Sequence, residues 1–262
     1  EENFFGKHSG VEPEPERWKH IVISSPLDPN LSILGWQQAA AGYAGVWATE
    51  NTREAIFEAM RARETYGTSG TLIRLRFFGG WNYPRNLVDK KNFVETAYKK
   101  GVPMGSDLPK KAGKAPTFAV WALKDPESGN LDRIQIVKGF INRWGRTDEK
   151  IYDVAWSDDR KPDAKTGKLP AVGTTVDVKK ATYTNDIGDT QLSAVWTDPD
   201  FDPEQKAVYY VRVLEIPTPR WTTYDAVRNN LPMPTDVPAT IQERAWSSPI
   251  WYTPAAMKTA KK

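Results

Sequence analysis

The chain has 262 residues, and its 36 Lys and Arg against 33 Asp and Glu give a formal net charge of +3. Hydrophobic residues at 39% and charged residues at 26% are typical of a globular protein and exclude a disordered tail. Without cysteine the chain forms no disulfide and no thiolate metal site. Charges of both signs are interspersed, and the longest apolar run, residues 39–48, is about half a membrane-spanning length. We therefore expect neither a nucleic-acid partner nor a membrane span.

Aromatic and turn-forming residues are abundant, with 11 Trp, 20 Pro and 18 Gly. This mixture favours a sheet-rich protein with many turns, in which large rings fill the space between sheets. The sequence starts at Glu1 without a methionine, so we expect the encoded protein to begin upstream of it.

The first part of the chain predicts one short strand and two helices. The apolar residues 21–23 predict the strand, and the Ala-rich residues 32–44 predict a helix. A second helix is expected over residues 52–65, capped by Asn51 and stopped by Gly67. Its apolar residues share one face: Ile56, Phe57 and Met60.

From about residue 70 onward, apolar residues alternate with polar ones. In residues 71–81, Ile73, Leu75 and Phe77 point one way while Arg74 and Arg76 point the other. Turn clusters separate five further runs of this kind, at 117–123, 132–141, 150–157, 190–197 and 207–216. These runs predict an antiparallel β-sandwich, with a short helical segment at residues 224–231. Together with the two early helices they give an α+β fold class.

Alternation also predicts which side chains of a strand are buried. In residues 150–157 we expect Tyr152, Val154 and Trp156 to point inward and Asp153 and Ala155 to point outward.

The first ten residues bring together the side chains of Glu1, Glu2, Asn3, Lys7 and His8. These carboxylates, the amide, the ammonium and the imidazole are enough to hold a metal or a phosphate. The alternative is a charged chain end. Because the chain has only two histidines, it does not complete a hydrolytic metal centre by itself.

Three arginines are further candidates for binding. Arg53 stands in the first turn of a predicted helix, where the helix dipole disfavours a cation, so it faces an external acidic partner or pairs with Glu50 or Glu54. Arg74 and Arg76 share one strand face, where they receive a phosphate or carboxylate ligand or are covered by an acidic neighbour.

Two acidic loops resemble calcium loops in composition only. One contains Asp198, Asp200 and Asp202, and the other contains Asp158, Asp159 and Asp163. Neither has the glycine and closing glutamate of an EF-hand, and prolines follow Asp198 and Asp202, so ordinary turns are favoured over calcium sites. The sequence contains neither a G-x-S-x-G motif nor a phosphate-binding glycine loop.

Several long stretches together resemble one known family. They include EENFFGKHSGVEPEPERWK, GVWATENTREAIFEAMRARETYGTSG, RVLEIPTPRWTTYDA and QERAWSSPIWYTP. These stretches resemble the C-terminal part of a bacterial family known as domain of unknown function 3604, and the resemblance covers essentially the whole chain.

The resemblance implies a relative of the polymerase-and-histidinol-phosphatase (PHP) superfamily, whose distorted barrel binds divalent Mn, Zn or Fe through His and Asp ligands. Residues 1–66 are then the end of the barrel, with a strand and two helices, and residues 67–262 are an appended β-sandwich. A final Asp-x-His ligand motif is expected just before Glu1. The resemblance also implies a periplasmic or secreted location.

Residue chemistry and the resemblance together give the candidate site. Lys7 and His8 match positions beside the expected metal centre, and the helix containing Arg53 matches the closing helix of related hydrolases. The candidate catalytic residues are Lys7, His8 and Arg53, the candidate substrate-binding residues are Asn3, Arg74 and Arg76, and the candidate metal ligands are Glu2 and His8.

The resulting expectation is the C-terminal portion of a metal-dependent hydrolase acting on a phosphoester or related ester. Its partner is the N-terminal metal-binding part of the same protein, without which we expect little turnover. The alternative is a non-catalytic β-sandwich binding module, in which Trp81, Trp144 or Trp221 stacks on a sugar-type ligand. A purely structural domain that mediates oligomerisation is a third possibility.

Overall fold

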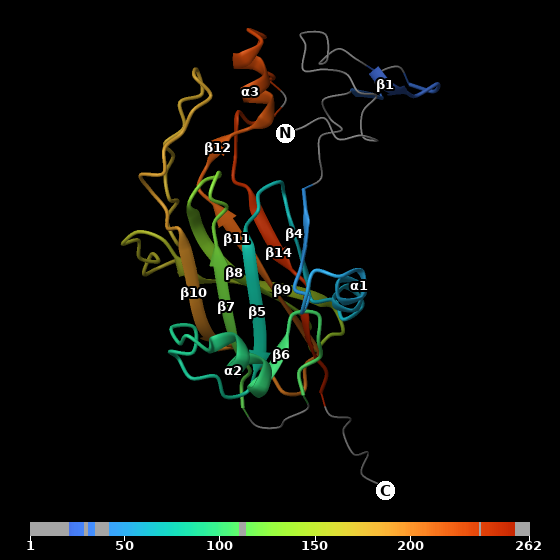
Figure 1. Cartoon of the computed structure of the whole chain (residues 1–262), viewed down its shortest axis with the longest axis vertical. Coiled ribbons are helices and arrows are strands. Elements are labelled where there is room, and N and C mark those ends of the chain that lie inside the picture. Colours follow the sequence, from blue (N-terminus) through green and yellow to red (C-terminus); the bar gives the residue numbers. More distant parts are fainter. Residues whose placement is uncertain (1–20, 29–30, 35–41, 110–113, 236, 255–262) are drawn as a thin grey trace, which may run out of the picture.

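The computed structural model describes residues 21–28, 31–34, 42–109, 114–235 and 237–254. Two antiparallel sheets face each other as a β-sandwich, with helices at its sides and at one end (Figure 1). The expected antiparallel, sheet-rich fold is therefore confirmed. None of the three helices in the described ranges has the length and apolar character needed to span a bilayer.

The smaller sheet has four strands in the order β10-β7-β5-β6. Their bounds are β5 (Arg74–Gly80), β6 (Gly101–Pro103), β7 (Thr117–Leu123) and β10 (Gln191–Thr197). Val120 of β7 lies opposite Phe77 of β5 on one side and Ala194 of β10 on the other. Three of these strands were expected from the alternation of apolar residues, and β6 was not.

The larger sheet has seven strands in the order β3-β4-β14-β11-β8-β9, with β15 also paired to β11. Their bounds are β3 (Ala44–Val46), β4 (Thr65–Thr68), β8 (Leu131–Ile141), β9 (Thr147–Trp156), β11 (Ala207–Glu215), β14 (Arg244–Ser247) and β15 (Ile250–Tyr252). The pairing of β8 with β11 runs from Phe140 opposite Ala207 to Leu131 opposite Glu215. Strand β11 is central, because it pairs with β8 along one edge and with β14 and β15 along the other.

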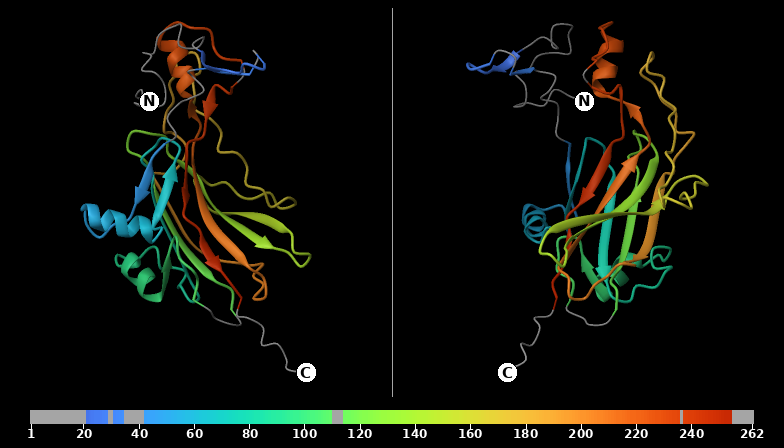
Figure 2. Two further views of the ribbon diagram at one scale, coloured as in Figure 1. Left: turned by 90° about the vertical axis from the view of Figure 1, so that its right-hand side faces the viewer. Right: turned by 180° about the vertical axis from the view of Figure 1, so that it is seen from behind.

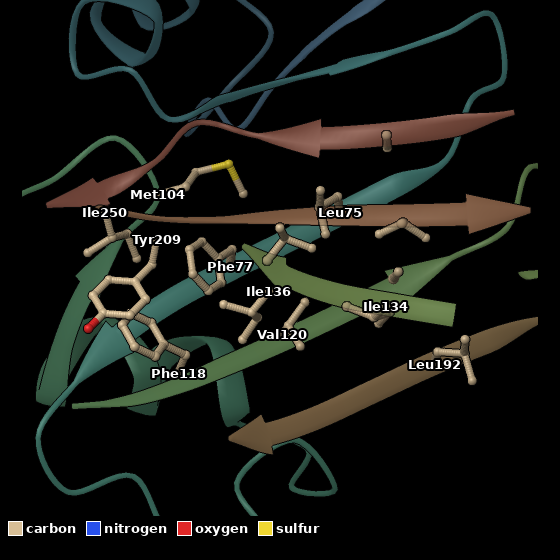
Figure 3. Packing of buried hydrophobic residues seen from close by; sticks show 14 of the residues in the cluster. Leu75, Phe77, Met104, Phe118, Val120, Ile134, Ile136, Leu192, Tyr209 and Ile250 are labelled. Carbon is tan, nitrogen blue, oxygen red and sulfur yellow. The ribbon is translucent and has the colours of Figure 1, made fainter. Parts of the chain in front are cut away.

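The core lies between the two sheets, where alternate side chains from each sheet interdigitate (Figure 3). The Phe77 and Phe118 rings of the smaller sheet stack with centroids 5.5 Å apart, and Phe118 lies 4.5 Å from the Tyr209 ring of the larger sheet. Ile136 and Val211 are fully buried beside them. Burying such rings contributes strongly to stability because each removes a large apolar area from water.

The outer face of the smaller sheet is covered by α2 (Phe93–Lys100) and the loop before it. Phe78, Ala119 and Leu87 pack together in this second apolar cluster. This packing explains why Phe78 is apolar although its neighbour Phe77 already faces the main core. The sequence analysis missed α2, which is short and has no side-chain cap at Asn92.

The helix predicted at residues 52–65 is α1 (Arg53–Arg61), and it is shorter than expected. Thr52 caps it in place of Asn51, since the Thr52 side chain accepts a hydrogen bond from the Ala55 N–H. The expected stop at Gly67 is also wrong, because the chain leaves the helix at Arg63, whose φ is 62°, and Gly67 lies in β4.

The helix predicted at residues 32–44 is contradicted at both ends. Residues Ser32–Leu34 form β2, which pairs with β1 (Ile21–Ser24), and Ala44 begins β3. Gly42 has φ +92°, and a Cβ at that position would lie 1.8 Å from the Thr68 carbonyl oxygen. Strand pairing and this close approach exclude a helix at the two ends of the predicted range, and residues 35–41 between them lie outside the described residues.

The boundary expected between residues 66 and 67 falls inside β4, which pairs with both β3 and β14. The chain from Ala44 onward therefore contributes to the larger sheet of the sandwich. Glu1 to His20 lie outside the described residues.

Strand β9 departs from strict alternation. The register of β8 and β9 shifts between Ile134 and Gln135, so that Ile134 lies opposite Ala155 but Gln135 lies opposite Asp153. Val154 and Ala155 consequently both pack against the core. The expected outward position of Ala155 is wrong because a β-bulge changes which residues face inward.

One end of the sandwich carries α3 (Trp221–Arg228), which begins earlier than the helical segment expected at residues 224–231. The helix follows directly on β12 (Thr218–Pro219), which pairs with β13 (Thr240–Ile241). Figures 1 and 2 show α3 projecting above the sheets, at the end opposite α2.

A buried ion pair joins the two sheets beside the end of β10. The Lys138 ammonium lies 2.6 Å from the Asp198 carboxylate and 2.7 Å from the Asp200 carbonyl oxygen. The Tyr209 hydroxyl donates to the same Asp198 oxygen at 2.7 Å. The Lys138 and Asp198 side chains are at most 1% exposed. An ammonium therefore already occupies the centre of one loop considered for calcium.

Asp202 and Asp163 of the two acidic loops make turns, as predicted. The Asp202 carboxylate accepts the Glu204 N–H at 2.9 Å, and the Asp163 carboxylate accepts the Thr166 N–H at 2.7 Å. Hydrogen bonds from Thr166 and Lys165 lower the pKa of Asp163. Such local bonds are typical of Asx turns.

Replacing Lys138 by Met should destabilise the protein by about 3–5 kcal/mol, because the buried Asp198 carboxylate loses its charged partner. Urea denaturation measures this change. Lys150→Met is the matched control: Lys150 pairs with Asp200 at 3.0 Å, but both side chains are nearly half exposed. We expect that control to cost no more than about 1 kcal/mol. Equal costs for the two variants would contradict the structural role assigned to Lys138.

Candidate functional site

Four of the predicted site residues, Glu2, Asn3, Lys7 and His8, lie outside the described residues. Their roles as catalytic, substrate-binding and metal-binding groups therefore remain predictions. Arg53 is the first residue of α1 and is exposed.

The two strand arginines have different surroundings. Arg74 is exposed, whereas the Arg76 guanidinium lies over the Trp47 ring, 3.6 Å from its centroid. Glu64 is an acidic neighbour of Arg76; burial raises the pKa of Glu64, while a hydrogen bond from Tyr98 and the Arg76 charge lower it. Arg76 is thus held in a network of protein side chains, in contact with a ring and close to a carboxylate.

The three tryptophans considered for ligand stacking are in three different environments. Trp81 is only 7% exposed and donates its indole N–H to the Pro109 carbonyl at 2.8 Å, so it is a core residue. The expected stacking of Trp81 on a ligand is wrong, because its ring is buried against the Phe201 ring 5.9 Å away. Trp144 is 69% exposed at the turn between β8 and β9. Trp221 is half-buried and lines a pocket.

This pocket, which we call the α3 pocket, has a volume of about 200 Å³. It lies at the end of the sandwich that carries β12 and α3, the upper end in Figure 1. Segments distant in sequence form its wall: Ser69, Gly70, Thr71, Glu127, Ser128, Tyr183, Thr218, Pro219, Trp221, Tyr224 and Glu243. The wall thus combines carboxylates, hydroxyls and aromatic rings.

Secondary structure explains how these side chains meet. Ser69 follows β4, Ser128 lies in the turn between β7 and β8, and Glu243 directly precedes β14. The Ser69 hydroxyl donates to the Glu243 carboxylate and accepts the Arg244 N–H at 2.9 Å. The ends of neighbouring strands therefore fix the polar side of the pocket.

Glu215, the last residue of β11, lies behind this wall and is fully buried. Its carboxylate accepts a hydrogen bond from the Ser128 hydroxyl at 2.5 Å. Burial raises the pKa of Glu215 to about 7, the Ser128 and Thr71 hydroxyls counteract this rise, and the Glu243 and Asp125 charges add to it. A carboxyl group with such a pKa can release or take up a proton near neutral pH.

The Thr71 hydroxyl, in a pocket residue that is 8% exposed, also contacts this carboxyl group. Its hydrogen bond lowers the pKa of Glu215 and so opposes the effect of burial. The buried carboxyl group is therefore held by the hydroxyls of two pocket residues, Ser128 and Thr71.

The neighbouring Asp125 carboxylate is held by the backbone. It accepts the Leu72 N–H at 2.7 Å and the Glu127 N–H at 2.9 Å. In the part of the chain that the structure describes, no three His, Cys, Asp or Glu side chains are grouped closely enough to hold a metal ion. The α3 pocket is therefore an acidic, aromatic cavity without a metal-ligand set among the described residues.

The sequence analysis missed Glu215, although a signal for it was present. In β11 the buried positions alternate, and Tyr209, Val211, Val213 and Glu215 all have the same parity. A carboxylate at the inward position of an apolar strand indicates a buried acid. Tyr183, Tyr224 and Glu243 gave no comparable signal, because they come from loops and a short helix.

Glu215→Gln should remove a pH dependence of stability. The pKa of Glu215 is higher in the folded protein than its ordinary value of 4.5. The folded state therefore holds this proton more tightly, and its stabilising contribution is present below pH 4.5 and lost as the pH rises through about 7. Between about pH 4 and pH 8 the wild type should lose about 3 kcal/mol of unfolding free energy relative to the variant.

Urea denaturation at both pH values measures this difference. Glu127→Gln is the control, because Glu127 is an exposed residue of the same pocket. Parallel pH profiles for the wild type and Glu215→Gln would show that Glu215 titrates normally.

The profile of the family described as "Protein of unknown function (DUF3604)" matches residues 1–254. No curated protein and no solved structure matches the chain. Because the family match covers nearly the whole sequence, the chain belongs to the DUF3604 family.

Proposed function

We propose that this chain is the C-terminal part of a metal-dependent hydrolase of the PHP type, in which the β-sandwich packs on a catalytic barrel. Membership of the DUF3604 family supports the proposal through the motifs that suggested it. The ester substrate and the metal centre are then bound mainly by the barrel, to which Glu2, Lys7 and His8 contribute. Divalent ions, when bound, activate water and stabilise negative charge on the ester.

One structural observation supports the proposal that another part of the encoded protein packs against this chain. Eight of the thirteen large hydrophobic side chains that are exposed in the described residues come from residues 21–60. They are Ile21, Ile23, Leu27, Leu31, Ile33, Tyr43, Phe57 and Met60. They lie on the β1–β2 hairpin, next to β3 and on α1, and exposed apolar side chains of this kind are typical of interaction surfaces.

Helix α1 carries one of these exposed apolar faces. It turns the buried Ala59 and the half-buried Ile56 toward the protein, but Phe57 is 61% exposed and Met60 is 57% exposed. The sequence predicted that Ile56, Phe57 and Met60 share one apolar face. Contact with a catalytic barrel would cover the outer part of that face.

The proposed contact with the barrel involves fewer residues than the segment 1–66 that the sequence assigned to the barrel. Since β3 and β4 belong to the larger sheet, the barrel contact is assigned to the segment before Ala44 and to the exposed side of α1. Arg53 begins α1 and is exposed, so it is placed to face this contact.

The double substitution Phe57→Ser and Met60→Ser should weaken binding of the chain to a separately expressed segment encoded upstream of Glu1. Burial of these two side chains is worth about 3–6 kcal/mol, so we expect at least a hundredfold loss of affinity. Analytical ultracentrifugation of the mixed chains measures it. Trp144→Ser is the control, because Trp144 is equally exposed on the distant β8–β9 turn. Undiminished binding of the double variant would contradict the assigned contact.

The hydrolase proposal is tested with the intact encoded protein and with this chain alone. The intact protein should contain divalent metal by mass spectrometry and hydrolyse bis-p-nitrophenyl phosphate, and a chelator should abolish this activity. The chain alone should show less than about 1% of that rate, because one missing metal centre removes most of the catalysis. Tight binding of several metal ions and ester cleavage by the chain alone would overturn the proposal.

The second candidate function is a ligand-binding module. The observation that favours it is the α3 pocket, in which Tyr183, Trp221 and Tyr224 stand beside carboxylates and hydroxyls. Rings and polar groups in one small cavity are typical of sites for small polar ligands, including sugars. The two functions are compatible, since the pocket contains none of the residues assigned to the barrel contact.

A further inference from the structure

We infer that the outer face of the larger sheet binds an oxyanion attached to a ring, such as a ring carboxylate or phosphate, through Arg212, Arg244 and Trp246. Buried and half-buried positions alternate along β11 and β14, and these three half-buried residues point away from the core. In the right view of Figure 2, no helix lies over β11 and β14 on this side of the sheet. The three residues are not among those assigned to the barrel contact, so the inference goes beyond the proposed function.

Strand pairing brings the two arginines to the same part of the sheet. Arg212 of β11 lies directly opposite Trp246 of β14, and Arg244 precedes Trp246 by two residues on the same face. The two arginines are therefore diagonal neighbours across the strand pair, at a separation of about 7–8 Å that long side chains can bridge. Both guanidinium groups can reach one bound anion.

One nitrogen of each guanidinium group holds it in place. Arg212 Nε donates to Gln135 Oε1 at 2.8 Å, and Arg244 Nε donates to the Gln242 carbonyl oxygen at 3.1 Å. The terminal nitrogens of both arginines form no hydrogen bond or ion pair with the residues that the structure describes. A guanidinium group fixed in this way is preorganised to bind an oxyanion through two N–H groups.

The acidic side chains on neighbouring residues have other partners. The Asp153 carboxylate accepts a hydrogen bond from Gln135 Nε2 at 2.8 Å, and the Glu243 carboxylate accepts one from the Ser69 hydroxyl. Within the described ranges, neither carboxylate forms an ion pair with the two arginines. Two half-buried cations side by side repel each other and attract an anion, which favours an oxyanion over a cation or a neutral ligand.

The surroundings of Trp246 favour a ligand that contains a ring. On the side away from Arg212, Gly67 of β4 lies opposite Trp246, and Ala44 of β3 lies opposite Gly67. Ala44 is exposed, and a Cβ at Gly67 would have only one neighbouring atom within 4 Å, a carbonyl oxygen 3.9 Å away. These small residues leave open space beside the Trp246 indole, where a sugar ring or an aromatic ring can pack.

Two simpler ligands compete with a ring-bearing oxyanion. An inorganic anion would use the two arginines alone, and a neutral sugar would use the Trp246 ring alone. The arginines and the ring share one face, and the Arg244 guanidinium carbon lies 6.0 Å from the centroid of the Trp246 ring. A ligand that combines charge and ring uses all three side chains at once, so the observations favour it.

The experiment uses isothermal titration calorimetry of the 262-residue chain with matched pairs of probes. Benzoate is compared with benzyl alcohol, and glucuronate is compared with glucose, so that each pair differs mainly in charge. The two pairs also distinguish an aromatic acid from an acidic sugar. Phenyl phosphate, compared with phenol, tests phosphate as the oxyanion, and sodium sulfate tests an inorganic anion. We expect at least one ring oxyanion to bind about tenfold more tightly than its neutral partner and than sulfate.

Variants of the two arginines locate the binding. Arg212→Gln and Arg244→Gln each remove one charge, and each should weaken binding of the ring oxyanion about tenfold. Arg212→Lys keeps the charge but loses the planar fork, so it should not restore full affinity. Arg85→Gln is the matched control, because it removes the same charge from an exposed arginine in the loop between β5 and α2 and should leave binding unchanged. Circular dichroism confirms that each variant is folded.

Several results would overturn the inference. They are equal affinity for every charged probe and its neutral partner, sulfate binding as tight as that of the ring oxyanions, binding of no probe, and binding that survives both glutamine variants of Arg212 and Arg244. The probe comparisons use the unaltered chain, so they decide the matter even if a variant does not fold. None of these results bears on the metal content or ester hydrolysis of the intact protein, so the two proposals fail separately.

Discussion

The buried ion pair between Lys138 and Asp198 is the constraint on which the arrangement of the two sheets depends. Lys138 belongs to β8 of the larger sheet, and Asp198 directly follows β10 of the smaller sheet. Because both charges are removed from water, the two sheets are held at the position where ammonium, carboxylate and the Tyr209 hydroxyl satisfy one another. The apolar core supplies most of the stabilisation, but apolar packing alone tolerates sliding of one sheet over the other.

With the sheets held in this way, the strand ends next to α3 form the α3 pocket. Glu215 ends β11, Ser128 lies in the turn before β8, and Glu243 precedes β14, so strand ends bring three polar side chains together. Helix α3 then adds Trp221 and Tyr224 as an aromatic side wall. A buried carboxyl group opposes stability unless hydrogen bonds replace its contacts with water, and the Ser128 and Thr71 hydroxyls supply such bonds to Glu215.

A different part of the molecule suggests how the sandwich is used in the encoded protein. The described residues before β3 and the outer side of α1 expose aliphatic and aromatic side chains, whereas the sandwich itself covers both faces of its smaller sheet. The surface proposed for the barrel and the α3 pocket therefore involve separate elements.

The sequence by itself determined the six strands of seven or more residues, since period-two alternation follows directly from strand geometry and survives in any sheet. The same alternation places Lys138 in β8 and Glu215 in β11 at positions that point inward. Only the tertiary structure decided the partners of these groups, the bulge that turns Ala155 inward, and the strand at Ser32–Leu34 where alanines nearby suggested a helix. These features depend on contacts between residues far apart in the chain, and local patterns carry no information about such contacts.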